Sequence, residues 1–308
     1  MQAAAAYSFC RASARYTISF YIRVEPHNQP SPLVPMRRIG LLLALSLWAL
    51  PAFAQMEKPT VELTAHRGES YDAPENTMAA LRLAWERNVP SVELDVHLTK
   101  DGRLILSHDA NTKRTTGVDK LVKESTLEEL QALDAGSWKG QRWAGERMPT
   151  LEEALTEVPA GTRVFIEVKV GPEAIPALVK AVRESGKAAE QLVVISFNID
   201  TIAESKRQLP ELKAYYLSSF KKDEATGAWT PTIDELIQRA KGAGADGLDL
   251  SYNGPIDAEA ARRIKAAGLE LYVWTVDDPE IARRMVAAGV DGITTNRADW
   301  LRAELAKH

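Results

Sequence analysis

The chain has 308 residues, 45% of them hydrophobic and 26% charged, with a formal net charge of −4 and a single cysteine, Cys10. This composition is typical of a globular protein and excludes a scaffold held together by disulfides. The sequence contains no long basic run, so we expect neither nucleic acid nor an anionic membrane surface as a partner.

Residues 36–54 have the pattern of a signal peptide. Two arginines after Met36 precede an apolar run from Ile39 to Leu50, and Ala52–Ala54 supplies the small residues that a signal peptidase recognises. We expect cleavage after Ala54 and export to the periplasm or the medium. The apolar run is too short to span a bilayer, so we expect no stable membrane anchor. Residues 1–35 are interpreted as an upstream extension from a misassigned start codon, or as part of a long natural leader.

Removing this leader leaves 254 residues with a net charge of −8, because the leader carries five arginines and one glutamate. A chain of that length is typical of a single (β/α)8 barrel and can bury a core without disulfides. We therefore treat residues 55–308 as one domain.

The first part of this domain contains a hairpin. Its expected strands are Val92–Leu98 and Arg103–Ser107, joined at Asp101-Gly102, a pair typical of a two-residue turn because both residues tolerate a positive φ. A strand at Val61–Ala65 and a helix from Thr77 to Trp85 precede the hairpin. The following residues, to about 148, lack long regular periodicity, apart from a short expected helix at Thr126–Leu133. We interpret residues 97–148 as an insertion.

From Pro149 onwards, helix and strand patterns alternate. The expected helices are Leu151–Glu157, Ala174–Glu184, Thr201–Gln208, Ile233–Lys241, Ala258–Ala266, Ile281–Ala287 and Ala298–Ala306. The expected strands are Val164–Val170, Leu192–Phe197, Leu212–Leu217, Gly247–Ser251, Leu271–Val276 and Gly292–Thr295. Together with the first part, this gives eight parallel strands and eight helices, which predicts an α/β fold of the (β/α)8 TIM barrel class. An open, doubly wound sheet is the alternative, but no glycine-rich nucleotide loop follows the first strand.

Polar residues gather at the ends of the expected strands, where barrel enzymes carry their chemistry. These residues are His66 and Arg67 after the first strand, Glu93 and Asp95 on the second, Glu167 and Lys169 on the third, and Trp274 on a later strand. The three carboxylates suit one hard divalent cation, Ca²⁺ or Mg²⁺. Arg67 and Lys169 would complement an anion such as a phosphate. An amphipathic hairpin with its polar face in water is the simpler alternative for the second strand.

Two histidines are candidates for acid–base catalysis near neutral pH. His66 follows the first strand, and folding of the hairpin brings His108 to the level of Asp95. A single histidine is as often structural as catalytic, but the combination with the carboxylates favours catalysis. His97 lies nearer the turn, and we interpret it as structural.

The order and spacing of ten short motifs resemble those of the glycerophosphodiester phosphodiesterases. The motifs are His66–Gly68, Glu75–Thr77, Glu93–Asp95, His108-Asp109, Leu133–Trp138, Pro149–Glu153, Glu167–Lys169, Ser196-Phe197, Trp274–Val276 and Gly289–Thr294. Each motif alone is weak, but the series spans nearly all of residues 55–308. Two positions depart from the family pattern: Asp277 stands where the family often has asparagine, and Asn296 where it often has aspartate. We expect these departures to affect substrate fit more than catalysis.

This resemblance implies a metal ion held by Glu93, Asp95 and Glu167, and a phosphate held by Arg67 and Lys169. It also implies that His66 and His108 are the acid–base pair, with supporting roles for Glu75 and Trp274. A role at the start of a helix, near a cap at Asn76, is the alternative for Glu75. Which histidine is the acid, and whether water or a substrate hydroxyl attacks first, stay open at this point.

The implied activity is hydrolysis of glycerophosphodiesters to sn-glycerol 3-phosphate and an alcohol. One alternative is a lysophospholipase D-like or sphingolipid phosphodiesterase of the same fold, which would favour a broad apolar patch at the barrel mouth. Another is a non-catalytic periplasmic barrel that binds phosphodiesters, although no member of the acid, base and metal sets is missing from the sequence. The sequence does not indicate an oligomeric state.

Overall fold

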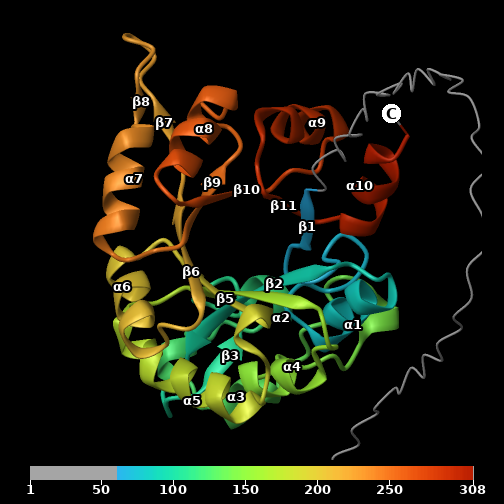
Figure 1. The fold of residues 1–308 in the computed structure, drawn as a ribbon. Helices are drawn as coiled ribbons and strands as arrows, with labels where there is room; N and C mark the ends of the chain where they lie inside the picture. The colour runs from blue at the N-terminus through green and yellow to red at the C-terminus, as the bar shows by residue number, and fades with distance from the viewer. Residues whose placement is uncertain (1–60, 308) are drawn as a thin grey trace, which may run out of the picture. The chain divides into compact units, whose positions relative to one another are not determined.

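Eight parallel strands form a closed barrel in the computed structural model, which describes residues 61–307. The predictions for the leader, residues 1–54, therefore lie outside the described residues. The barrel strands are β1 (Glu62–Ala65), β2 (Ser91–Leu98), β4 (Arg163–Val168), β5 (Leu192–Ser196), β6 (Lys213–Ser218), β9 (Gly247–Ser251), β10 (Glu270–Trp274) and β11 (Gly292–Thr295). The ring closes because β1 pairs with both β11 and β2 (Figure 1). The predicted TIM barrel is confirmed, and the open-sheet alternative is wrong.

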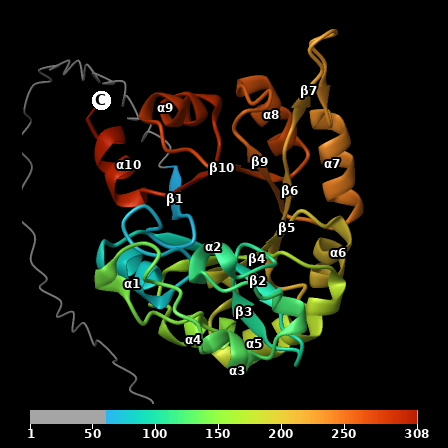
Figure 2. The ribbon, with the colours of Figure 1, turned by 180° about the vertical axis from the view of Figure 1, so that it is seen from behind.

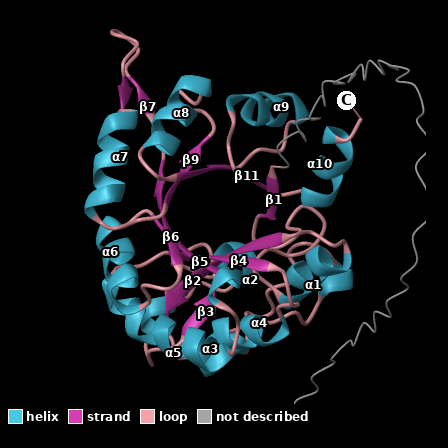
Figure 3. Ribbon diagram, viewed as in Figure 1, coloured by secondary structure: helices cyan, strands magenta, loops and turns pink. Residues whose placement is uncertain are grey.

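A helix follows each barrel strand and lies outside the ring of strands (Figures 2 and 3). These helices are α1 (Met78–Glu86), α4 (Leu151–Glu157), α5 (Ile175–Ser185), α6 (Ile199–Gln208), α7 (Ile233–Gly242), α8 (Ala258–Ala266), α9 (Pro279–Ala288) and α10 (Ala298–Leu305). Each helix buries one apolar face against the outer surface of the strands, and this layer forms the larger core.

Polar side chains define where several of these helices begin. The side chains of Thr150 and Thr232 each accept a hydrogen bond from the backbone N–H three residues further on. In return, the backbone N–H of each threonine donates to the side chain of that third residue, a glutamate. α6 begins two residues earlier than predicted because the Asn198 side chain accepts from the N–H groups of Asp200 and Thr201. Local sequence chemistry thus sets the helix starts.

The hairpin after β2 is present, but its predicted two-residue turn is wrong. The short strand β3 (Leu104–Leu106) pairs antiparallel with β2, and the loop between them runs from residue 99 to residue 103. Only Gly102 in this loop has a positive φ, 75°. The Thr99 hydroxyl accepts from the Arg103 N–H and donates to the Asp101 carboxylate, which stabilises the longer loop.

The insertion between β3 and α4 has a small core of its own. It contains α2 (Lys113–Thr116), α3 (Leu127–Gln131) and two 3-10 helices, Val122–Glu124 and Gln141–Trp143. Its buried side chains are Ile105, Val122, Leu130, Ala135 and Met148. The expected helix at Thr126–Leu133 is shorter in the structure, because Thr126 is the N-cap and the helix ends at Gln131. Two further 3-10 helices, Pro172–Ala174 and Ala189–Gln191, precede α5 and β5.

Aromatic side chains fill the barrel interior at the end where the strands begin. Phe165, Tyr215 and Tyr272 pack together with ring centroids 5.2 to 6.0 Å apart. Arg163 lies over the Phe165 ring and forms an ion pair with Glu62. This end is closed by packing, so the polar residues at the other end of the strands are the ones that border an open cavity.

A separate hairpin, β7 (Lys221–Lys222) and β8 (Trp229–Thr230), lies between β6 and α7 and extends beyond the helices in Figures 1 and 2. The sequence pattern does not indicate this hairpin, because its strands have two residues each. Among residues 61–307, no helix combines the length and the apolar character needed to cross a membrane.

Candidate active site

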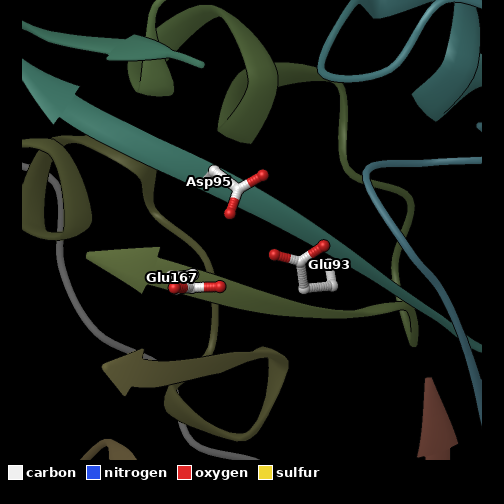
Figure 4. Close-up of side chains that lie close together, drawn as sticks. All are labelled: Glu93, Asp95 and Glu167. Atoms are coloured by element: carbon white, nitrogen blue, oxygen red, sulfur yellow. The ribbon is translucent and has the colours of Figure 1, made fainter. Parts of the chain in front are cut away.

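Three buried carboxylates face one another on two neighbouring strands of the barrel. Glu93 and Asp95 project from β2, and Glu167 projects from β4, where it is the direct partner of Asp95 in the strand ladder. One oxygen atom from each carboxylate lies within 4.8 Å of the others (Figure 4). Alternate residues of a strand project from the same face, and the parallel register sets Glu167 beside Asp95. These two features together produce the carboxylate trio, Glu93, Asp95 and Glu167.

The three carboxylates of the trio repel one another when they are ionised. Burial raises the pKa of Glu93 well above its usual range, and the Asp95 and Glu167 carboxylates raise it further. Burial and the Asp95 carboxylate likewise raise the pKa of Glu167 from 4.5 to about 7. Burial acts in the same direction on Asp95, but the charges of Arg67 and Lys169 outweigh it and lower that pKa. The trio therefore carries more negative potential than its two cationic neighbours neutralise.

The trio fits a hard divalent cation. Glu93 Oε1 and Asp95 Oδ1 are buried and have no hydrogen-bond partner among the described residues. Unpartnered buried carboxylate oxygens are costly, and an oxygen-preferring cation is the group that satisfies them without protonation. The residues present are thus suited to hold Ca²⁺ or Mg²⁺, the cations expected from the sequence.

Arg67 and Lys169 lie on either side of the trio. Arg67, in a left-handed conformation with φ 56°, places its Nε 3.2 Å from Asp95 Oδ2 and donates from its backbone N–H to Glu93 Oε2. Lys169 Nζ donates to Glu167 Oε1 at 2.7 Å and lies 3.4 Å from Asp95 Oδ1. Both cations border the cavity, so they can also contact an anion there.

His66 is held by an amide rather than by a carboxylate. Its Nδ1 lies 2.7 Å from Asn296 Oδ1, and Asn296 Nδ2 donates to Asp277 Oδ2. Because a carboxylate only accepts, Asn296 must direct its amide N–H groups to Asp277 and its carbonyl to His66. His66 Nδ1 is therefore the protonated nitrogen, and Nε2, 4.0 Å from Glu93 Oε2, carries the lone pair. Burial and the charge of Arg67 lower the pKa of His66 from 6.5 to about 4.

His108 is held by a carboxylate. Its Nδ1 lies 2.7 Å from Asp109 Oδ1, and Arg114 Nε donates to the other oxygen of Asp109. The His97 Nε2 bonds to the backbone carbonyl of His108, and the Ser107 N–H donates to the Asp95 carbonyl. These contacts bring His108 to the level of Asp95, as the hairpin pattern predicts.

A cavity of about 220 Å³ joins these groups. Of the nine predicted site residues, seven line it: His66, Arg67, Glu93, His108, Glu167, Lys169 and Trp274. The two others lie behind its wall. Asp95 is fully buried between Arg67 and Asn76, and Glu75 accepts hydrogen bonds from Arg67 and Arg114.

The expected helix cap at Asn76 is wrong. Thr77 is the N-cap of α1, and the Asn76 side chain instead bonds to Asp95, with its Nδ2 donating to Asp95 Oδ2 at 2.8 Å and its Oδ1 accepting from the Asp95 N–H. Glu75 thus lies outside the helix and holds Arg67 from the side away from the trio. Its position is a supporting one.

Several residues around the site were not predicted from the sequence. Asn296 and Asp277 were assigned to substrate fit, yet the structure places them directly behind His66. Arg114, in the insertion, connects Glu75 to Asp109. Asp249 lies on β9 and borders the cavity. In the sequence it was not recognised as a site residue, because a polar residue at one position of an alternating strand is common. Its signal was an acidic residue inside an otherwise apolar buried strand.

Comparisons with known proteins agree with this geometry. The model of the glycerophosphoryl diester phosphodiesterase family matches residues 66–300. A glycerophosphodiester phosphodiesterase of Caldanaerobacter subterraneus is 38% identical over 244 residues, covering 77% of this chain and 94% of the relative. A glycerophosphodiester phosphodiesterase of Bacillus subtilis is 31% identical and covers 76% of this chain and 83% of the relative.

A solved structure extends the likeness to three dimensions. The phosphodiesterase of Oleispira antarctica, solved in complex with the product sn-glycerol-3-phosphate, superposes with a TM-score of 0.72. It is 30% identical, and the match covers 80% of this chain and 97% of that chain. The range matched by the family model, residues 66–300, contains the carboxylate trio and both histidines of the cavity. The chain therefore belongs to the glycerophosphoryl diester phosphodiesterase family, a family of phosphoric diester hydrolases.

Proposed function

We propose that this protein hydrolyses glycerophosphodiesters to sn-glycerol 3-phosphate and an alcohol. One observation carries the proposal: two histidines and two basic side chains, Arg67 and Lys169, lie around the carboxylate trio in one cavity. Such a set can bind a phosphodiester and move protons at both ends of the cleaved bond. The relatives named as glycerophosphodiester phosphodiesterases, and the product bound to the Oleispira antarctica enzyme, support glycerol phosphate as the common part of the substrate.

The carboxylate trio would hold one divalent cation, Ca²⁺ or Mg²⁺. When bound, such a cation supplies positive charge that polarises a phosphate oxygen and stabilises the negative charge of the transition state. The chain's own contribution is to hold the three carboxylates close together and to keep Asp95 ionised. Arg67 and Lys169 lower the pKa of Asp95 for that purpose.

Arg67 and Lys169 would bind the phosphate. Each already contacts the trio and borders the cavity, so each can share its charge between a carboxylate and a phosphate oxygen. Arg67 is held in place by Glu75, which leaves its guanidinium little freedom. This arrangement orients the phosphate before the reaction and so lowers the entropic cost of reaching the transition state.

We assign the base to His66 and the acid to His108 from their partners. The Asn296 carbonyl fixes a neutral His66 with its lone pair on Nε2, the form that takes a proton from the attacking oxygen. His108 bonds through Nδ1 to the Asp109 carboxylate, which orients the ring so that the other nitrogen can give a proton to the departing alkoxide. The Asp277–Asn296 pair and Asp109 are thus positioning residues for the two histidines.

A coupled assay that detects free sn-glycerol 3-phosphate tests the activity. The purified protein is given glycerophosphocholine, glycerophosphoethanolamine and glycerophosphoglycerol, each with Ca²⁺, with Mg²⁺ and with a chelator. We expect turnover that requires one of the cations and is abolished by Glu167→Gln. Glu211→Gln, at an exposed carboxyl in the loop before β6, is the matched control and should behave as wild type. Absence of product from all three diesters with both cations would contradict the proposal.

We also propose export, because residues 36–54 have the pattern of a signal peptide. Glycerophosphodiesters outside the inner membrane would then be the accessible substrates. N-terminal sequencing of the protein recovered from a periplasmic extract should begin at Gln55. A cytoplasmic product that retains Met36 would contradict export without affecting the proposed activity.

A further inference from the structure

Asp249 is a buried carboxyl that the proposed mechanism does not use. It lies on β9, its residue is 2% exposed, and it borders the cavity of the active site. Its Oδ1 has no hydrogen-bond partner within residues 61–307. Burying a carboxyl oxygen without a partner is energetically unfavourable. A polar group left in this state inside a cavity is suited to bind a ligand.

Other aspartates close to these strands have structural partners. Asp246 accepts from the backbone N–H of Ala214, and Asp291 accepts from the backbone N–H of Leu271. Asp249 makes no such contact in the part of the chain that the structure describes. Burial raises its pKa well above the usual range, and the Glu167 carboxylate adds to the effect. Asp249 Oδ1 thus lacks the kind of partner that Asp246 and Asp291 have, which argues against a structural role.

The order of the strands places Asp249 across the barrel from β2. β9 and β2 lie four strands apart in either direction around the closed ring, so Asp249 faces the strand that carries Glu93 and Asp95. On one side of the cavity, between β4 and β9, the apolar side chains of Ile195 and Leu217 form part of the lining. A phosphate anion is drawn to Arg67 and Lys169, away from Asp249. An uncharged polar group attached to that phosphate would therefore extend across the cavity to Asp249.

We propose that Asp249 is a specificity-determining residue that binds a hydroxyl group of the substrate's glycerol moiety. A neutral carboxyl donates to a hydroxyl and accepts from it, and a carboxylate accepts from it, so the contact does not require one protonation state. The glycerol carries free hydroxyls in every glycerophosphodiester, whereas the choline of glycerophosphocholine carries none after esterification. The inference rests on the proposed function and adds to it the feature by which the site distinguishes glycerol from a plain alkyl chain.

The test compares two substrates that differ only in one glycerol hydroxyl. Glycerophosphocholine is one, and its deoxy analogue, which keeps the phosphate, the choline and the hydroxyl next to the esterified carbon, is the other. The measured quantity is the ratio of their kcat/KM values, followed by choline release with the cation that supports activity. Wild type should prefer glycerophosphocholine by about 10- to 100-fold, the effect of leaving a buried polar group unpaired. Asp249→Leu should reduce this ratio to near one, and Asp249→Asn, which still forms hydrogen bonds, should retain most of it.

Thermal unfolding of the same variants separates binding from folding. Asp249→Leu replaces an unpartnered carboxyl with an apolar side chain of similar size, so its Tm should equal or exceed that of wild type. A wild-type ratio near one, or an Asp249→Leu ratio equal to a high wild-type ratio, would overturn the inference while choline release still supports the proposed function. Equal losses on both substrates would also overturn it, because they would indicate a contact with the choline or the phosphate. Failure of wild type to release choline from either diester would instead refute the proposed function.

Discussion

Replacing Glu167 by glutamine should stabilise the metal-free protein at neutral and alkaline pH. Burial and the Asp95 carboxylate raise the pKa of Glu167 from 4.5 to about 7 in the folded protein. In the unfolded chain the pKa returns to its ordinary value. The folded state therefore holds this proton more tightly, and the stability present below pH 4.5 is lost as the pH rises through 7. Glutamine keeps the shape of the side chain but has no charge to ionise.

The size of the effect follows from the gap between the two pKa values. Each pH unit in that gap is worth about 1.4 kcal/mol, so ionisation of Glu167 costs on the order of 3 kcal/mol by pH 8. For a domain of this size, that corresponds to a difference in Tm of roughly 6–12 °C. Glu167→Gln should recover most of this difference at pH 8 and gain little at pH 4.

Thermal unfolding in the presence of a chelator, at several pH values from 4 to 8, measures the prediction. Glu211→Gln serves again as the control and should follow the wild-type pH dependence. Added Ca²⁺ should raise the Tm of wild type at pH 8 and have a smaller effect on Glu167→Gln, because one ligand of the trio is lost. A metal-free Glu167→Gln protein that unfolds at a lower temperature than wild type at pH 8 would refute the electrostatic argument.

Three further outcomes follow from the histidines and their supports. His66→Ala and His108→Ala should each slow hydrolysis of glycerophosphocholine by about 10²- to 10⁴-fold. An activated aryl diester should restore the rate of the His108 variant alone, because its leaving group needs no proton. Recovery of the His66 variant instead would reverse the assignment of base and acid. Asp277→Ala should lower kcat by about 10- to 100-fold and leave KM nearly unchanged, since it releases Asn296 behind His66; an unchanged kcat would rule out that support. Asp109→Asn should reduce activity mainly with alkyl leaving groups, and equal losses on alkyl and aryl diesters would argue against its role.

Much of the active site was predictable because its residues follow regular strands. Two carboxylates that are two residues apart on β2, and another at the matching level of β4, must meet if the strands are parallel neighbours. The alternation of helices and strands predicted that neighbourhood. The hairpin pattern placed His108 near Asp95 in the same way, even though the turn itself is longer than its Asp-Gly pair suggests.

Contacts between distant loops were not predictable in this way. Asn296 reaches His66 across 230 residues, and its effect depends on Asp277, 19 residues away on another strand end. Arg114 contacts Glu75 from an insertion that has no long periodic pattern. Loop conformation depends on tertiary packing rather than on periodicity, so the sequence did not indicate the partners of these residues.

The sequence by itself determined the fold class, the strands that carry the chemistry and the composition of the carboxylate trio, because these depend on periodicity and on local turn and cap residues. The tertiary structure alone decided which groups each side chain meets. It placed an amide behind His66 and a carboxylate behind His108, and it left Asp249 without a partner in the described residues. Closure of the barrel brings β9 opposite β2, and only that closure turns an ordinary aspartate of a buried strand into part of a cavity wall.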